Sequence, residues 1–137
     1  WTVEDAVILA RELKAAGLDF VCVSSGGIRG GVRVPVEPAY QVPLAARVRE
    51  GAGIATRAVG LIADAVQAER IVAVGQADLV ALARAFLDNP RWAWHAADRL
   101  GTKLSYPPQY ARVAAPLWPG AKLARPADFD KEMATVP

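Results

Sequence analysis

Cysteine and histidine are almost missing from this chain, which has one residue of each in 137. The single cysteine, Cys22, excludes an internal disulfide and is typical of proteins kept in a reducing cytosol. One cysteine and one histidine, His95, cannot supply the three or four clustered ligands of a zinc site. The sequence therefore predicts a cytoplasmic protein without a metal centre. Cys22 stands between two valines, and we expect its thiol to be buried and inert.

Long apolar runs and a charge of one sign are missing too. No stretch reaches the ~18 apolar residues of a membrane span, and no positively charged leader precedes an apolar segment at the start. Acidic and basic residues are mixed, the formal net charge is +2, and no basic stripe is present. We therefore expect no membrane and no nucleic-acid partner. With 53% hydrophobic and 22% charged residues, the composition is typical of a folded globular protein.

Predicted helices and strands alternate along the first hundred residues. Thr2 and Asp5 have the spacing of a capping box, Asp64 can cap a later helix, and Asn89-Pro90 can begin another. Short runs rich in β-branched residues between the helices are typical of buried strands. This alternation predicts parallel strands joined by crossover helices, hence an α/β fold. The predicted helices cover residues 3–16, 42–50, 65–74, 84–87 and 90–100, and the predicted strands cover 19–24, 54–59 and 78–82.

Three parallel strands are too few for a complete architecture of this kind. They cannot close a barrel, and both edges of such a sheet need further protein to pair with. Residues 106–137 differ, because they contain six of the ten prolines. We divide the chain into an α/β part, residues 1–105, and an irregular proline-rich tail, residues 106–137, which can serve as a subunit interface.

Two loops that follow predicted strands have the composition of a phosphate site. Gly60 follows the second strand and lets a backbone approach a ligand closely. Ala83 and Arg84 follow the third strand and begin a short helix, where free backbone N–H groups lie beside a guanidinium. In closed parallel barrels, phosphate commonly binds at the loops after the last two strands. A glycine after a strand is more often a simple turn, so the pattern alone leaves both interpretations open.

Seven motifs, taken in order, are more specific. They are WTVED at residues 1–5, LDFVCVSSGG at 18–27, YQVP at 40–43, AVGLI at 58–62, ADLV at 77–80, AR at 83–84 with DNP at 88–90, and PQY at 108–110. In order and approximate spacing they resemble bacterial old yellow enzymes of the xenobiotic-reductase type. The resemblance covers residues 1 to about 112. It implies that the chain is the C-terminal portion, strands six to eight with their helices, of an FMN-binding (β/α)8 TIM barrel.

The resemblance also implies which residues bind the cofactor. The family's FMN phosphate is held by backbone at the glycine after strand seven, here Gly60, and by a Gly-Arg pair after strand eight, here Ala83 and Arg84. Alanine in place of glycine matters only if the backbone there needs a positive φ. In this subgroup an arginine after the Gln-Tyr motif reaches a neighbouring subunit's active site, and Arg112 matches it. The alternative is that Arg112 is a solvated arginine on the tail.

Several of the family's functional groups have no counterpart in this chain. The substrate-binding histidine pair, the first-strand flavin contacts and the strand-five arginine all lie outside it, so no catalytic residue is expected in this segment. His95 is interpreted as a surface or packing residue of a helix. The glycine-rich loop, residues 26–31, lies near the flavin edge or is a simple connection. Arg57 is a charge within a predicted strand, and the sequence does not identify its partner.

The activity implied by the resemblance is that of an ene-reductase. FMN would be reduced by NADPH or NADH and would then reduce the activated C=C bond of an electrophilic alkene. The expected partners are the remainder of the barrel, strands one to five, and further copies of the chain in a homo-oligomer. The isolated segment is expected to be inactive. The alternatives are a non-catalytic barrel fragment with a structural or oligomerisation role, the end of a larger fused flavoenzyme, or another phosphate-binding barrel enzyme, which fits the layout but not the motifs.

Overall fold

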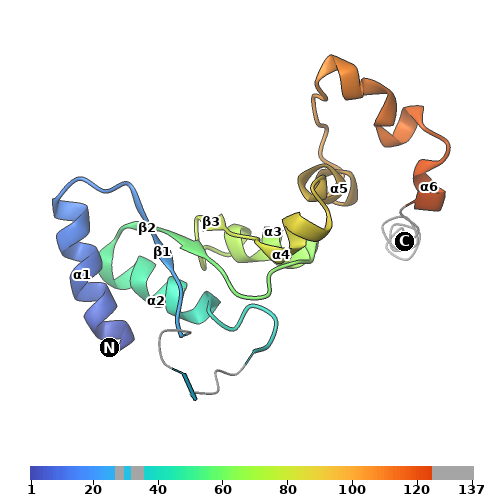
Figure 1. Ribbon diagram of the computed structural model, residues 1–137. Helices are drawn as coiled ribbons and strands as arrows, with labels where there is room; N and C mark the ends of the chain where they lie inside the picture. The colour runs from blue at the N-terminus through green and yellow to red at the C-terminus, as the bar shows by residue number, and fades with distance from the viewer. Residues whose placement is uncertain (27–29, 32–35, 125–137) are drawn as a thin grey trace. The chain divides into compact units, whose positions relative to one another are not determined.

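The computed structural model describes residues 1–26, 30–31 and 36–124, in two compact units, Trp1–Asp88 and Asn89–Pro137 (Figure 1). The first unit contains a three-stranded parallel sheet in the order β1-β2-β3, which confirms the predicted α/β class. The boundary predicted after residue 105 stays a prediction. The first unit comprises α1 (Val3–Ala15), β1 (Phe20–Val23), α2 (Val42–Ala52), β2 (Ala55–Ala58), α3 (Ala65–Ala73), β3 (Leu79–Val80) and α4 (Arg84–Asp88).

Two of the predicted helix caps are present in the first unit. The hydroxyl of Thr2 accepts the Asp5 N–H at 3.2 Å, and the Asp5 carboxylate accepts the Thr2 N–H at 2.7 Å. This is the reciprocal capping box that begins α1. The Asp64 carboxylate accepts the Gln67 N–H at 2.9 Å and so caps the N-terminus of α3 with a single side-chain hydrogen bond. Both helices therefore begin where the sequence predicts.

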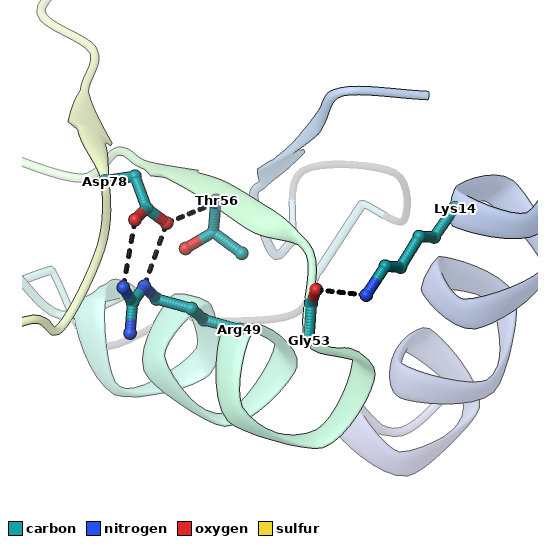
Figure 2. Close-up of polar contacts among 5 residues, drawn as sticks. All are labelled: Lys14, Arg49, Gly53, Thr56 and Asp78. Carbon is teal, nitrogen blue, oxygen red and sulfur yellow. Dashed lines mark hydrogen bonds and ion pairs between the residues drawn. The ribbon is translucent and has the colours of Figure 1, made fainter. Parts of the chain in front are cut away.

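Helix α1 packs against α2, and two of its basic side chains bind the C-terminal end of α2. The Arg11 guanidinium donates twice to the Gly51 carbonyl, at 2.9 and 2.7 Å. The Lys14 ammonium donates to the Gly53 carbonyl at 2.6 Å (Figure 2). Positive charge at this end offsets the negative pole of the α2 dipole and satisfies carbonyls that have no partner within the helix. The core between the helices and the sheet consists of Val7, Ala10, Val48, Ala52 and Ile54.

One face of the sheet turns toward these helices, and the pairing of the strands decides which side chains lie on it. Thr56 lies beside Val21, and Ala58 lies between Val23 and Val80. Thr56 and Ala58 are fully buried, and the two valines of β1 pack on the core cluster of α1 and α2. This face supplies the apolar contacts that hold the first unit together.

The opposite face of the sheet is left open by the described residues and carries Phe20, Cys22, Arg57 and Leu79. Phe20 and Leu79 are 40% and 45% exposed. Cys22 is exposed as well, so the predicted burial of its thiol is wrong. The reason is strand alternation, because the two neighbouring valines point to the helices and Cys22 points away. Arg57 stands 5.4 Å from the Phe20 ring centroid, and its buried Nε has no hydrogen-bond partner among the described residues.

Asp78, just before β3, forms an ion pair with α2 and a hydrogen bond with β2 (Figure 2). The Arg49 guanidinium donates to both carboxylate oxygens of Asp78, at 2.9 and 3.0 Å. Asp78 also accepts the backbone N–H of the fully buried Thr56 at 2.9 Å. The Arg49 guanidinium first, and then the Thr56 N–H, hold the pKa of the Asp78 carboxyl below its usual value. One carboxylate thus connects three elements at the edge where the strands begin.

The second unit contains α5 (Trp92–Arg99), the 3-10 helices η1 (Pro108–Val113) and η2 (Ala115–Leu117), and α6 (Ala121–Ala124). The predicted start of α5 at Asn89-Pro90 is wrong, because the N-cap is Arg91. Asn89 instead accepts the Arg91 N–H at 3.0 Å and closes the turn that precedes the helix.

Candidate functional site

A cavity of about 470 Å³ lies at the edge of the sheet where the three strands end. Its lining residues are Ser24, 40–41, 59–63, 81–85 and Asp88. In parallel α/β folds the loops at this edge bind ligands, because the helices that follow direct free N–H groups toward it. Gly60, Ala83 and Arg84, which the sequence places in two separate loops, line the same cavity.

The chain turns sharply after β2, at Gly60 and Leu61, which we call the Gly60 turn. Gly60 has φ +115° and Leu61 has φ +48°, so two successive residues lie in the positive-φ region. A Cβ on Gly60 would lie 2.9 Å from Gln41 Nε2 and 2.9 Å from Tyr40 Cε1. The Gly60 carbonyl accepts the Ala39 N–H at 2.9 Å. Glycine is therefore required at this position both by the backbone and by the space around it.

Gln41 is a cavity residue to which the sequence assigned no role. Its side chain is almost fully buried, with 3% exposure, although it is polar. Its amide oxygen accepts the backbone N–H of Ser25, which follows β1. Its amide nitrogen lies against Gly60, on the side where a Cβ would project. The only sequence signal was the YQVP motif at residues 40–43, which indicates family and not the function of the glutamine.

Ala83 and Arg84 also line the cavity. Ala39 and Leu61 are the only non-glycine residues with positive φ in the described part of the chain, so Ala83 has ordinary backbone geometry. The methyl group of Ala83, where the resemblance implies a glycine, therefore causes no backbone strain here. Arg84 begins α4 and is exposed, and within the described ranges no carboxylate forms an ion pair with it. A guanidinium in this position can bind an anion in the cavity.

Arg112 belongs to the second unit, where it is exposed on η1. Two residues earlier, Tyr110 holds η1 against α5. The Arg91 guanidinium lies 4.3 Å from the Trp94 ring centroid and 4.4 Å from that of Tyr110. Trp94 also contacts Tyr110 directly, with ring centroids 5.4 Å apart, and packs edge-on against Tyr106 at 4.9 Å. This stack of one cation and three rings fixes the segment that carries Arg112.

His95 lies on α5, half-buried, with Nδ1 2.8 Å from the side-chain nitrogen of Asn89. Since the Asn89 amide nitrogen can only donate, His95 Nδ1 accepts and the ring is held in one tautomer. The described residues contain no group of three or more side chains suited to a metal ion. Nor does any helix in those ranges combine the length and the hydropathy that a transmembrane span requires.

Comparison with known proteins identifies the family of this chain. Residues 9–103 match the model of the NADH:flavin oxidoreductase / NADH oxidase family, and the chain belongs to that family. It is similar to proteins named NADPH dehydrogenase in several bacteria. It is 49% identical over 111 residues to that of Geobacillus sp. (strain WCH70), which covers 81% of this chain and 32% of the relative.

Two further relatives carry the same name. The chain is 47% identical over 109 residues to NADPH dehydrogenase of Halalkalibacterium halodurans and 46% identical over 110 residues to that of Listeria innocua. Each alignment covers 80% of this chain and 32% of the relative. The chain therefore spans about a third of the length of the curated relatives that it matches.

Proposed function

We propose that this chain forms the phosphate-binding part of an FMN-dependent NAD(P)H oxidoreductase that reduces activated C=C bonds. The observation that carries the proposal is the cavity at the ends of the strands, in which Gly60, Ala83 and Arg84 meet. Family membership and the name of the relatives, NADPH dehydrogenase, support the redox class. Bound FMN would supply the redox chemistry, which is hydride transfer from a reduced nicotinamide to the β-carbon of an electrophilic alkene.

The residues of the cavity fit the phosphate end of FMN. Gly60 lines the cavity, and the absence of a side chain there lets the turn pack closely against Tyr40 and Gln41. Arg84 adds a cation with five N–H donors, which suit phosphate oxygens. The residues of this chain therefore bind and orient the cofactor, whereas proton and hydride transfer to the substrate require groups from elsewhere.

The open face of the sheet supports the further proposal that these strands are the sixth to eighth of a (β/α)8 barrel. Phe20 and Leu79 are apolar and exposed on that face, and β1 and β3 form the two edges of the sheet in the described chain. Strands one to five of the barrel would cover the face and pair with both edges. On this proposal those strands and the segment described together form the barrel.

Replacement of Arg84 by alanine tests the proposed phosphate site. We expect the FMN dissociation constant of the complete flavoprotein to rise by ~10–100-fold, because a charge-assisted hydrogen bond contributes about 1.5–3 kcal/mol. Titration of apoprotein with FMN, followed by quenching of flavin fluorescence, measures the change. Arg70→Ala removes an exposed arginine of α3 that does not line the cavity, and this control should bind FMN as the wild type does. Equal affinity of the Arg84→Ala variant and the wild type would remove Arg84 from the site.

We also propose that Arg112 completes the active site of a neighbouring subunit in a homo-oligomer. Its exposure on η1 and the stack of Arg91, Trp94 and Tyr110 beside it support this role, because a contact across an interface needs a rigid support. The alternative, a solvated arginine without function, predicts no effect on activity when the side chain is removed.

Complementation between two impaired variants tests the role of Arg112. Arg112→Ala should lower kcat/KM with an enone substrate by ~10–100-fold, if one charged contact is lost. Unfolding and refolding Arg112→Ala together with Gly60→Ala subunits should restore activity, because the intact cofactor site of one subunit then receives Arg112 from the other. In a dimer, random mixing yields roughly a quarter of the wild-type activity. No recovery above the separate variants would show that Arg112 does not act between subunits.

A further inference from the structure

Gln41 stands between the ends of two neighbouring strands. Its amide oxygen holds the Ser25 N–H after β1, and its amide nitrogen lies against Gly60 after β2. The residue is 97% buried in a wall of the cavity, since only 3% of its surface is exposed. A buried polar side chain is costly unless its hydrogen bonds contribute to the structure or to a ligand. The burial of Gln41 therefore needs a structural or functional reason, whereas a solvent-exposed glutamine would need none.

The neighbourhood of Gln41 explains why the side chain is a neutral amide. The Ser25 N–H needs an acceptor, which either an amide or a carboxylate oxygen could supply. On the other side, the amide nitrogen lies next to the Gly60 turn, and Arg84 lines the same cavity. A carboxylate at this point would satisfy Ser25 equally well, but it would place a negative charge in a cavity with the features of an anion site. Only the neutral amide serves both neighbours.

We propose that Gln41 is a positioning residue that holds the Gly60 turn in its phosphate-binding geometry and keeps this wall of the cavity free of negative charge. The proposal rests on the assignment of FMN phosphate to this cavity and adds a consequence for selectivity. Gln41 contributes to the preference for a flavin that bears a phosphate monoester over the same flavin without it. The isoalloxazine and ribityl parts of the ligand do not depend on Gln41 in this way.

The ratio of the affinities for FMN and riboflavin in the complete flavoprotein tests the proposal. Gln41→Glu keeps the size of the side chain and its acceptor for Ser25 but adds a charge. We expect the FMN dissociation constant at pH 8 to rise by ~10–100-fold, as for two like charges several ångströms apart in partly screened surroundings, with riboflavin affected less than about twofold. The matched control is Gln76→Glu, which makes the same change at an exposed glutamine between α3 and β3. It should leave both affinities unchanged.

A second variant, Gln41→Met, removes the hydrogen bond to Ser25 without adding charge. We expect FMN affinity to fall about fivefold, the effect of one lost hydrogen bond, and riboflavin affinity to change less.

Equal losses for FMN and riboflavin in the Gln41 variants would overturn the proposal, because they would show a general structural effect. Selective loss in Arg84→Ala without selective loss in Gln41→Glu would overturn this inference alone. No selective loss in either variant would overturn the phosphate assignment itself.

Discussion

Replacement of Gly60 by alanine is expected to abolish measurable FMN binding at micromolar cofactor. A φ of +115° is a conformation that residues with a Cβ rarely adopt, and such strain costs about 1–3 kcal/mol. The added methyl group would also lie 2.9 Å from side-chain atoms of Tyr40 and Gln41, and overpacking of this kind costs about 1–3 kcal/mol. The turn must move to relieve both, which displaces the backbone proposed to bind phosphate. We expect the FMN dissociation constant to rise by roughly 100-fold or more.

Fluorescence titration with FMN measures this loss, and thermal unfolding of the apoprotein shows whether the variant is folded. Gly75→Ala is the matched control, because Gly75 also has a positive φ, +74°, but its nearest side-chain atom lies 3.8 Å from a Cβ and it is remote from the cavity. This control should lose about 1 kcal/mol of folding stability and keep its FMN affinity. If both variants lose FMN affinity to the same degree, backbone strain in general, and not the position of Gly60, explains the result.

Replacement of Asp78 by alanine is expected to destabilise the fold more than replacement of its partner Arg49. Alanine at position 78 leaves the buried N–H of Thr56 without an acceptor, which costs about 1–3 kcal/mol. Arg49→Ala removes an exposed partner and leaves the bond from Thr56 to Asp78 intact, so its effect on the free energy of unfolding should be smaller. Urea denaturation of the two variants measures the difference. A larger loss in Arg49→Ala would show that the ion pair, and not the Thr56 N–H, dominates.

Acid should remove the contribution of Asp78 to stability. Its pKa is lower in the folded protein than the usual value of about 3.9 in the unfolded chain. The carboxylate therefore stabilises the fold above the unfolded pKa, and this contribution is lost as the pH falls through the folded pKa. Asp78→Asn should be less stable than the wild type at pH 7, with the difference shrinking as the pH falls below about 4. Denaturation at several pH values tests this, and a difference independent of pH would exclude the ionisation of Asp78 as its cause.

Local signals made the helices of the first unit predictable. The capping box of Thr2 and Asp5 and the cap at Asp64 depend on residues three apart, so the sequence contains all the information that is needed. Cys22 shows where such reasoning fails, since its neighbours predict burial but Cys22 is exposed on the face that the described residues leave open. Exposure depends on what covers each face, which a short segment does not reveal.

The cavity was predictable only in part. Gly60 and Arg84 follow strands and could be singled out as a glycine and an arginine after a strand end. Gln41 could not, because its proposed role arises from contacts with Ser25 and Gly60, which are 16 and 19 positions away in the chain. Neither composition nor periodicity distinguishes a glutamine buried between two turns from one on a helix surface. Its contacts appear only when the strand ends are assembled.

The two ends of β2 carry different features, a stabilising hydrogen bond at the start and the Gly60 turn after the end. Thr56, near its start, is tied to Asp78, whereas Gly60 follows its end beside the cavity. Four residues of extended chain span ~13 Å, and substitutions farther apart than about 7–10 Å usually add independently. If the proposed phosphate site is correct, the end of the sheet where the strands begin could be reinforced for heat resistance while the end where they finish is remodelled for other flavins. Substitutions at one end of the strands would likewise have little effect at the other end, so that stability and the proposed cofactor binding can evolve separately.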